Sequence, residues 1–393
     1  MNSKNSKHIV FLGLSGFPIG MAAIQRQILL GRALISEGWT VTVICTRSTH
    51  GNNVKIRKVG NYQGIRYVYL FDPIRKQNFF HRNFQKLSAP LIELFLLRKL
   101  NSKQDIYCAI VSNSNSFLNS IKSFLHSRII GFKVIINLVE VYKERDRVTL
   151  FKKINDYFFN KFGLYFYDAF LPISDYIIDY FKSFHRRFHK IPVIVDVNTI
   201  SNLNCQKSEQ PFFLFCGAAA YYKSFDFIIE SFGLVKRADC KLFLVTNGTK
   251  LQLDSIKNKA KTHGIEDRVV ILKNLSDFEL HTLYKRANGL LLPLFNTIQD
   301  KARFPHKLGE YLASSTVVLS NPVGEINNYL QNEINVMFSP SSDCRSYADN
   351  MEWVLENSQE ALKIGERGLQ VSSLNFDYTI LAPGINDFLT SLK

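Results

Sequence analysis

The sequence contains no apolar stretch that approaches the ~20 residues needed for a transmembrane helix. Its first apolar run, residues 8–14, is too short for the hydrophobic part of a signal peptide, and no small-residue cleavage site follows it. We therefore expect a cytoplasmic protein that is soluble or only peripherally attached to a membrane.

Metal and disulfide signatures are also missing. None of the six cysteines stands in a CxxC or another metal-ligand spacing, and four of them lie in or beside apolar runs, as a small hydrophobic side chain does. The nine histidines show no HExxH motif and no paired spacing. These absences predict free thiols in a reducing compartment and no metal or other cofactor.

Acidic residues are scarce. The chain has 33 Asp and Glu against 49 Lys and Arg, which gives a formal net charge of +16. Such an excess favours a polyanionic partner, namely nucleic acid, an anionic membrane face or a phosphorylated substrate. A basic surface that only aids solubility is the alternative. Because 46% of the residues are hydrophobic, global disorder is excluded.

Short runs rich in Val, Ile, Phe and Tyr alternate with helical patterns, and several of these runs are apolar without alternation, as in a parallel sheet buried on both faces. In the first half the predicted strands are residues 8–14, 40–46, 65–71, 107–113, 133–139, 168–174 and 191–196. The polar stretch 201–210 is interpreted as a linker. After it the predicted strands are residues 212–217, 241–246, 268–272, 289–295, 316–321 and 335–338.

Two successive sets of alternating strands and helices predict an α/β protein with two doubly wound, Rossmann-like domains facing each other. Ligands of such folds bind beyond the carboxyl ends of the strands, so the cleft between the domains is the expected site. The predicted domains are residues 1–200 and 201–375, and a last segment, 376–393, is expected to pack back on the first domain.

The first predicted strand runs into a glycine-rich turn that includes Gly13, Gly16 and Gly20. Such a turn lets a ligand approach the backbone and the start of the next helix. The spacing differs from GxGxxG, and Cys45, Thr46 and Arg47 stand where a ribose-binding acid would end the next strand. A dinucleotide site is therefore disfavoured, and a purely structural turn is the alternative.

The second half carries the richer pattern. Gly217 and Lys223 fall in a predicted strand-to-helix loop, where a lysine can meet a diphosphate as a mobile charge, although a lone loop lysine is usually just solvated. Downstream the chain reads RFPHKLGEYLASS from Arg303, and Glu310 is expected near the start of a helix. A carboxylate there can accept hydrogen bonds from two vicinal ribose hydroxyls. Arg303 and Lys307 supply charge for phosphate oxygens, and Gly324 allows a close turn.

The order of these residues resembles glycosyltransferase family 4, which has the GT-B fold. The block is most similar to the RFPxKLxEYLASG block of members that build bacterial surface polysaccharides, where a Gly-Glu turn follows; here that turn is Gly324-Glu325. The resemblance covers nearly all of residues 212–378. It covers the first half only through the strand–helix rhythm and the turn at residues 16–20.

The resemblance implies retaining transfer of a sugar from a nucleotide-diphosphate donor without an obligatory metal, with the acceptor on the first domain and the donor on the second. Lys223 and Arg303 would then neutralise the diphosphate and Glu310 would hold the donor ribose, which makes these three the candidate catalytic residues. Residues 273–275 would meet the base through main-chain groups. The full donor-binding set is Gly20, Gly217, Lys223, Asn247, Leu275, Arg303, Lys307, Glu310, Gly324 and Glu325.

The sequence departs from the family pattern at two places. Many relatives have a second glutamate before the ribose-binding one, with seven residues between the two, and Ala302 stands at that position; Asp300 is a possible substitute. Many also have an arginine after the first glycine, where this chain has Ala218. In the first domain, Glu140 follows a predicted strand and is the carboxylate best placed to reach the cleft on the acceptor side, although a plain surface glutamate is an equal alternative.

Two basic stretches interleave cations with aromatic residues. Residues 72–103 contain seven Lys or Arg and two acidic residues, and residues 182–190 read KSFHRRFHK. Such stretches suit an anionic lipid surface or a nucleic acid backbone. Two amphipathic helices with basic solvent faces are the structural alternative.

We interpret the whole as a hexosyl-type glycosyltransferase of surface polysaccharide synthesis. It is expected to act on a glycan or a lipid-diphosphate-linked acceptor at the inner face of the cell membrane, and not on nucleic acid. A basic nucleic-acid-binding protein is the rival class, although no helix-turn-helix, RNP or zinc-finger signature is present. Another GT-B activity, such as a sugar-nucleotide epimerase, and an inactive partner subunit also remain open.

Overall fold

The computed structural model describes residues 7–51, 55–75, 78–112, 116–141 and 149–392. By internal contacts the chain forms two units, Met1–Ile194 with Tyr378–Lys393, and Val195–Asp377. The stretch 201–210, which we interpreted as a linker, lies within the second unit. Its Lys207 is fixed there, because its Nζ donates to the Ala287 carbonyl at 2.6 Å and to Thr316 Oγ1 at 2.9 Å.

The first unit is built on a sheet of eight strands in the order β3-β4-β2-β1-β5-β6-β7-β8. Only the pairing of β3 with β4 is antiparallel. The strands are β1 (His8–Leu12), β2 (Thr40–Cys45), β3 (Val59–Tyr62), β4 (Ile65–Tyr69), β5 (Ile106–Ser112), β6 (Lys133–Leu138), β7 (Ala169–Pro172) and β8 (Arg187–Phe188). The central strands are buried along almost their whole length, which explains their unbroken apolar sequence.

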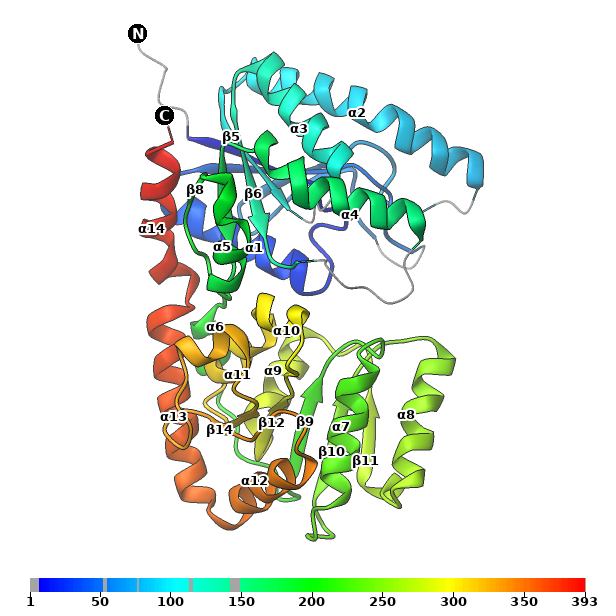
Figure 1. Cartoon of the computed structure of the whole chain (residues 1–393), viewed down its shortest axis with the longest axis vertical. Coiled ribbons are helices and arrows are strands. Elements are labelled where there is room, and N and C mark those ends of the chain that lie inside the picture. Colours follow the sequence, from blue (N-terminus) through cyan, green and yellow to red (C-terminus); the bar gives the residue numbers. More distant parts are fainter. Residues whose placement is uncertain (1–6, 52–54, 76–77, 113–115, 142–148, 393) are drawn as a thin grey trace. The chain divides into compact units, whose positions relative to one another are not determined.

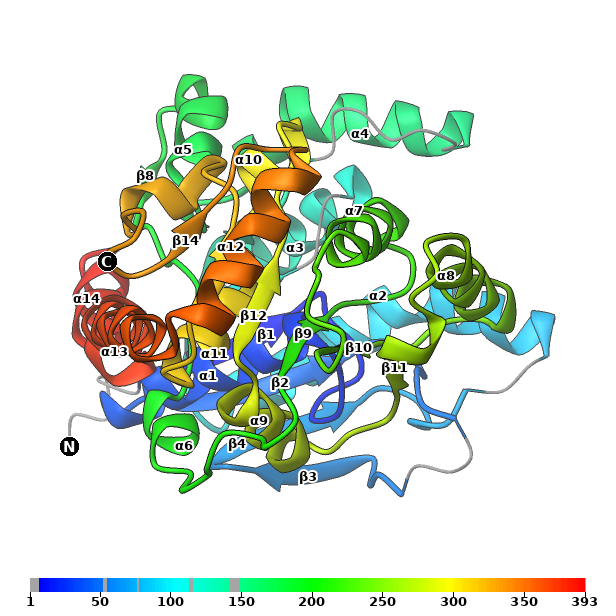
Figure 2. The same cartoon turned by 90° about the horizontal axis from the view of Figure 1, so that it is seen from below.

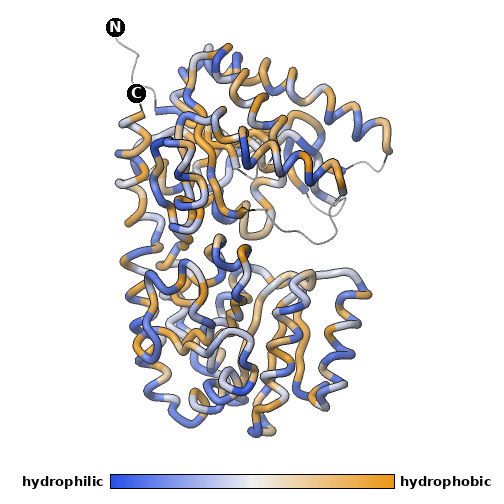
Figure 3. Tube along the Cα trace, viewed as in Figure 1, coloured by the Kyte–Doolittle hydropathy of each residue, from blue (hydrophilic) through white to orange (hydrophobic). Residues whose placement is uncertain are grey.

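Helices cover both faces of this sheet (Figure 1). They are α1 (Ala22–Ser36), α2 (Phe79–Asn101), α3 (Phe117–Ile130), α4 (Leu150–Phe162), α5 (Asp175–Phe181) and α14 (Tyr378–Thr390). On one face α1 packs against α14, whose Ile385 and Leu389 join the core of strands β1 and β2. On the other face α2, α3 and α4 lie side by side. Figure 3 shows hydrophobic residues along the strands and also along α2 and α4.

Residues 191–196 do not form the predicted strand. They run extended and buried, but only Val195 makes a bridge, to Asp377. Pro192 cannot donate to a sheet ladder. The carbonyls of Ile191 and Pro192 instead accept from the buried guanidinium of Arg26 on α1, at 2.7 and 2.5 Å. The apolar pattern therefore reflects burial of the segment that leads out of the first unit.

The second unit contains a wholly parallel sheet of six strands in the order β11-β10-β9-β12-β13-β14. They are β9 (Phe212–Cys216), β10 (Lys241–Val245), β11 (Val269–Leu272), β12 (Gly289–Leu292), β13 (Val318–Ser320) and β14 (Met337–Phe338). The helices are α6 (Val197–Ser201), α7 (Tyr222–Gly233), α8 (Lys250–Thr262), α9 (Asp277–Arg286), α10 (Ile298–Ala302), α11 (His306–Ala313), α12 (Cys344–Glu356) and α13 (Ser358–Asn375).

Helices α7, α8 and α12 cover one face of this sheet and α9 and α11 the other (Figure 2). The turn predicted at Gly324 opens a short 3-10 helix, η4 (Gly324–Asn328). Each unit is therefore a Rossmann-like α/β layer structure. Among the residues that the structure describes, every helix is too short or too polar to span a bilayer.

Candidate functional site

The loops that follow β9, β10, β11, β12 and β13 lie at one edge of the second sheet, because these strands are parallel. Hydrogen bonds join the first two of these loops. The Gly217 N–H donates to the Val245 carbonyl at 3.1 Å, and the Ala219 N–H donates to the Asn247 carbonyl at 3.2 Å. The fold thus brings the predicted donor-binding residues of this half to one edge.

Glu310, on α11, lies at this edge and has contacts to several polar side chains. Its Oε2 accepts from Lys307 Nζ at 2.8 Å and from the Tyr284 hydroxyl at 3.2 Å, and its Oε1 lies 3.3 Å from His306 Nε2. The side chain is 11% exposed. Tyr311 ties this helix to the end of β9, since the Cys216 N–H donates to the Tyr311 hydroxyl at 2.9 Å.

Electrostatics keep Glu310 ionised. Burial alone would raise the pKa of this carboxyl, but the charge of Lys307 and the hydrogen bond and charge of His306 hold the pKa well below its usual value. Burial works against the charged form of Lys307, yet the Glu310 carboxylate raises the pKa of that ammonium. The pair is therefore charged at neutral pH.

The partners of Glu310 leave it acceptor capacity. A carboxylate offers about four lone-pair sites. The contacts of Lys307, Tyr284 and His306 occupy three of them, and they fix the orientation of the group. A rigid, ionised carboxylate that retains a lone pair is suited to accept a hydrogen bond from a ligand hydroxyl.

Arg303 and Lys223 both lie near the start of α7. The guanidinium of Arg303 lies over the ring of Tyr221, 5.3 Å from its centre, and Tyr221 immediately precedes α7. Lys223 is exposed in the first turn of α7, which begins at Tyr222, and not in the strand-to-helix loop where we predicted it.

Asp300, the possible substitute for the glutamate absent at residue 302, is held by two contacts. Its Oδ1 lies 2.6 Å from Arg303 Nη2, and its Oδ2 accepts from the Phe295 N–H at 2.8 Å. Ala302 is completely buried. Asp300 therefore holds Arg303 and closes the loop after β12.

Gly324 packs directly against α10. Its φ is +70°, and a Cβ there would lie 2.8 Å from the Asp300 carbonyl oxygen and 2.9 Å from Lys301 Cα. Glu325, the next residue, is buried. Only glycine allows this turn to approach the loop that presents Arg303.

The remaining predicted residues are placed as follows. Leu275 is half-buried after β11, and Asn247 is exposed after β10. Gly20 and Glu140 belong to the first unit, where Gly20 shortly precedes α1 and Glu140 follows β6. Their predicted roles toward donor and acceptor stay predictions.

Sequence reasoning missed Tyr284, His306 and Cys216. His306 had a signal, since it stands four residues before Glu310 on one helix face. Tyr284, on α9, and Cys216, at the end of β9, had none, because only tertiary packing brings them to α11. In the described part of the chain, no three His, Cys, Asp or Glu side chains are arranged to hold a metal ion.

The similarity of the chain to known proteins includes the residues at this edge. Residues 198–371 match the family model described as glycosyl transferases group 1. Solved structures match over nearly the full chain. The chain has the GT-B fold of glycosyltransferases. The matched segment contains every predicted donor-binding residue except Gly20 and supports a transferase role.

Three of these GT-B structures show the extent of the likeness. A glycosyltransferase from Rickettsia africae is 14% identical, with 99% of each chain covered and a TM-score of 0.71. Sucrose-phosphate synthase from Thermosynechococcus elongatus is 15% identical, with 98% of this chain and 99% of that chain covered and a TM-score of 0.75. The Anabaena protein HepE, solved with UDP and glucose, is 12% identical, with 98% and 100% covered and a TM-score of 0.71. No curated protein matches in a sequence search.

Proposed function

We propose that this protein is a retaining, metal-independent glycosyltransferase of family 4 that moves a hexosyl group from a nucleotide-diphosphate sugar to a glycan or lipid-diphosphate-linked acceptor in surface polysaccharide synthesis. The observation that carries the proposal is the ionised, oriented Glu310 carboxylate at the carboxyl edge of the second sheet. Its remaining lone pair fits a ribose hydroxyl of the donor.

The start of α7 supplies the diphosphate site of this proposal. The first-turn amides of Tyr222 and Lys223 have no intrahelical partner, and no side chain caps the helix. Together with the helix dipole and the cations of Lys223 and Arg303, they favour an anion. As the glycosidic bond breaks, charge on the leaving diphosphate would be stabilised by these preorganised groups.

The first unit supplies a surface for the membrane part of the proposal. On α2 the side chains of Phe80, Phe84, Leu87 and Phe95 are 63–81% exposed. On α4, Leu150 and Phe151 are also exposed, beside Lys152 and Lys153. Apolar side chains among cations favour the headgroup region of an anionic bilayer. This supports a peripheral location at the inner face of the cell membrane.

The second basic stretch contributes less to such a surface. Residues 182–190 form a 3-10 turn and the edge strand β8 rather than the amphipathic helix considered above. Residues 76 and 77 of the first stretch lie outside the described residues.

The donor site is tested by thermal shift and calorimetry of the full chain with UDP-, GDP- and dTDP-sugars. We expect the sugar nucleotides of one base to stabilise the protein against heat. Lys223→Gln should weaken binding of that donor about tenfold. Lys257→Gln is the matched control, because Lys257 is an exposed lysine in the middle of α8. Absence of affinity for every nucleoside diphosphate would contradict the proposal and favour an inactive subunit.

The reaction is tested with the donor so identified and a lipid-diphosphate glycan acceptor, in buffer containing EDTA. We expect a product with the donor's anomeric configuration, read by NMR coupling constants. Conversion of the nucleotide sugar in the absence of acceptor would instead indicate an epimerase. Tight, steeply salt-dependent binding of nucleic acid without donor affinity would favour the rival class.

A further inference from the structure

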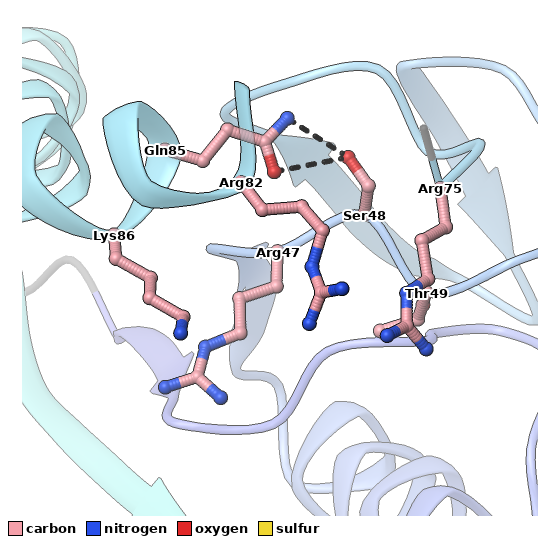
Figure 4. A pocket seen from close by; sticks show the side chains of 7 residues that line it. All are labelled: Arg47, Ser48, Thr49, Arg75, Arg82, Gln85 and Lys86. Atoms are coloured by element: carbon pink, nitrogen blue, oxygen red, sulfur yellow. Dashed lines mark hydrogen bonds between the residues drawn. The ribbon is translucent and has the colours of Figure 1, made fainter. Parts of the chain in front are cut away.

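A cavity of about 280 Å³ in the first unit is lined mainly by cations. Arg47 follows β2, Arg75 follows β4, and Arg82 and Lys86 come from the first two turns of α2 (Figure 4). Figure 4 shows the ends of Arg47, Arg82 and Lys86 pointing into the same space between the helix and the loops. The parallel pairing of β2 with β4 explains why segments distant in sequence meet here.

None of these four cations is paired with a carboxylate in the described part of the chain. No acidic side chain lines the cavity, and none of the four forms an ion pair with a described residue. Arg82 and Lys86 also stand near the amino end of α2, where the helix dipole disfavours positive charge, and the first turn has no acid. A bound anion would offset both the mutual repulsion and the dipole.

The cavity walls are held in place without a ligand. The Thr49 N–H donates to the Pro73 carbonyl at 3.1 Å, and the Arg75 N–H donates to the His50 carbonyl at 2.9 Å. Gln85 is buried, and its Nε2 donates to Ser48 Oγ at 3.2 Å (Figure 4). The backbone of the walls is therefore ordered before an anion binds, and the ordering cost of binding falls on the cationic side chains.

The same walls are tied to the glycine-rich turn that follows β1. The Arg47 N–H donates to Ser15 Oγ at 3.1 Å. The hydroxyl of Tyr69 donates to the Phe17 carbonyl at 2.9 Å and lies 2.8 Å from His50 Nε2. The cavity therefore adjoins the carboxyl edge of the first sheet, where ligands of such folds bind.

We propose that this cavity binds the phosphate of a phosphomonoester or diphosphate ligand. Three guanidinium groups and an ammonium suit a group with at least two negative charges, and guanidinium forks match its oxygens in pairs. The ligand is the phosphate-bearing part of the acceptor, an assignment that rests on the proposed function. Exposed Phe80 and Phe84 on the same end of α2 place the site beside a surface suited to lipid.

The test is calorimetric titration of the full chain with inorganic pyrophosphate. The nucleoside diphosphate found in the donor screen is present in excess, so that the second unit is occupied. We expect saturable binding that the double variant Arg47→Gln/Arg82→Gln weakens about tenfold or more. The control, Arg98→Gln/Lys99→Gln, makes the same charge change at the far end of α2, on exposed residues outside the cavity, and leaves the affinity unchanged.

Two kinds of vesicle distinguish the source of the phosphate. Phosphatidylcholine vesicles carry either phosphatidic acid, a phosphomonoester, or phosphatidylglycerol at matched surface charge. A lipid-borne ligand predicts that Arg47→Gln/Arg82→Gln weakens binding to the phosphatidic acid vesicles more than to the others. If the ligand is soluble, Arg47→Gln/Arg82→Gln should lower the affinity for pyrophosphate and leave the affinities for both kinds of vesicle unchanged.

The proposal is overturned if pyrophosphate binding does not saturate, or if the control pair weakens it as much as the cavity pair. In the transfer reaction, the cavity pair should raise KM for the acceptor while leaving KM for the donor unchanged. The binding results stand even if no transfer is detected, so failure of the proposed reaction and failure of the cavity site are separate outcomes.

Discussion

Nζ of Lys307 lies 2.8 Å from Oε2 of Glu310, one turn away on the same short helix. Both side chains are mostly buried, at 27% and 11% exposure. The two ends of this ion pair therefore depend on each other, and a variant of one leaves the other in a poorly solvated place.

Truncation of Glu310 should harm stability as well as binding. We expect Glu310→Ala to lower the free energy of unfolding by about 3–5 kcal/mol, because it leaves the Lys307 ammonium buried without its partner. Glu310→Gln keeps an acceptor oxygen and should cost less. Urea unfolding of both variants measures the difference, and equal stabilities would show that the pair is not effectively buried.

The role of Arg303 should depend on its planar guanidinium group and not on its positive charge alone. Arg303→Lys retains the charge but cannot contact Asp300 and a phosphate oxygen with one planar fork. We expect kcat/KM for the donor to fall by roughly one to two orders of magnitude, which corresponds to about 1.4–2.8 kcal/mol. Steady-state kinetics measure it, and unchanged kcat/KM would remove Arg303 from the site.

A buried carboxylate between α2 and α3 should make stability depend on pH. Glu93 is completely buried, with Lys122 Nζ at 2.8 Å and His126 Nδ1 at 3.2 Å. Burial alone would raise the pKa of Glu93, but Lys122 and His126 hold this pKa below its ordinary value of 4.5. The stabilisation is therefore complete above 4.5 and is lost as pH falls through the lower, folded-state pKa.

The comparison that isolates this effect is wild type against Glu93→Gln. The gap between their free energies of unfolding should be largest at neutral pH and shrink in acid below 4.5. Urea titrations across this range measure it. A gap that is constant with pH would mean that the pKa of Glu93 is the same in the folded and unfolded states, and a gap that shrinks as pH rises would mean that Glu93 is protonated in the folded protein.

Gly324 offers a test of the turn that supports Arg303. Gly324→Ala forces both a left-handed conformation, which costs about 1–2 kcal/mol, and a clash with the backbone of α10. Gly264 is the matched control, since its φ is +65° and an added Cβ there would meet nothing within 4 Å. Unfolding should show a larger loss for Gly324→Ala than for Gly264→Ala, and equal losses would argue against the close approach.

Much of the strand pattern was predictable because strands buried on both faces of a parallel sheet have unbroken apolar sequences. The same reasoning failed at residues 191–196, where Ile191 and Ile194 are buried in the hydrophobic core of the first unit although the segment is not a strand. The sequence pattern also placed Lys223 in a loop, because Tyr222 and Lys223 form the first turn of α7 without belonging to its apolar pattern.

Residues at the site were predictable where one helix or loop carried them, as with Lys307 and Glu310. Tyr284 and the Asp300–Arg303 pair depend on how α9 and the loop after β12 pack. The basic cavity was least accessible to sequence reasoning. Arg47 gave evidence only against a dinucleotide site, and nothing in its local sequence linked it to Arg82.

The central claim is that Glu310 holds the ribose of a nucleotide donor. Its most direct test is a four-way calorimetric comparison of wild type and Glu310→Gln, each with the ribonucleoside diphosphate that binds and with its 2′,3′-dideoxy analogue. We predict that Glu310→Gln lowers the affinity for the ribonucleotide but not for the dideoxy analogue, with a coupling energy of about 1.5–3 kcal/mol. Equal loss of affinity for both ligands would contradict the account.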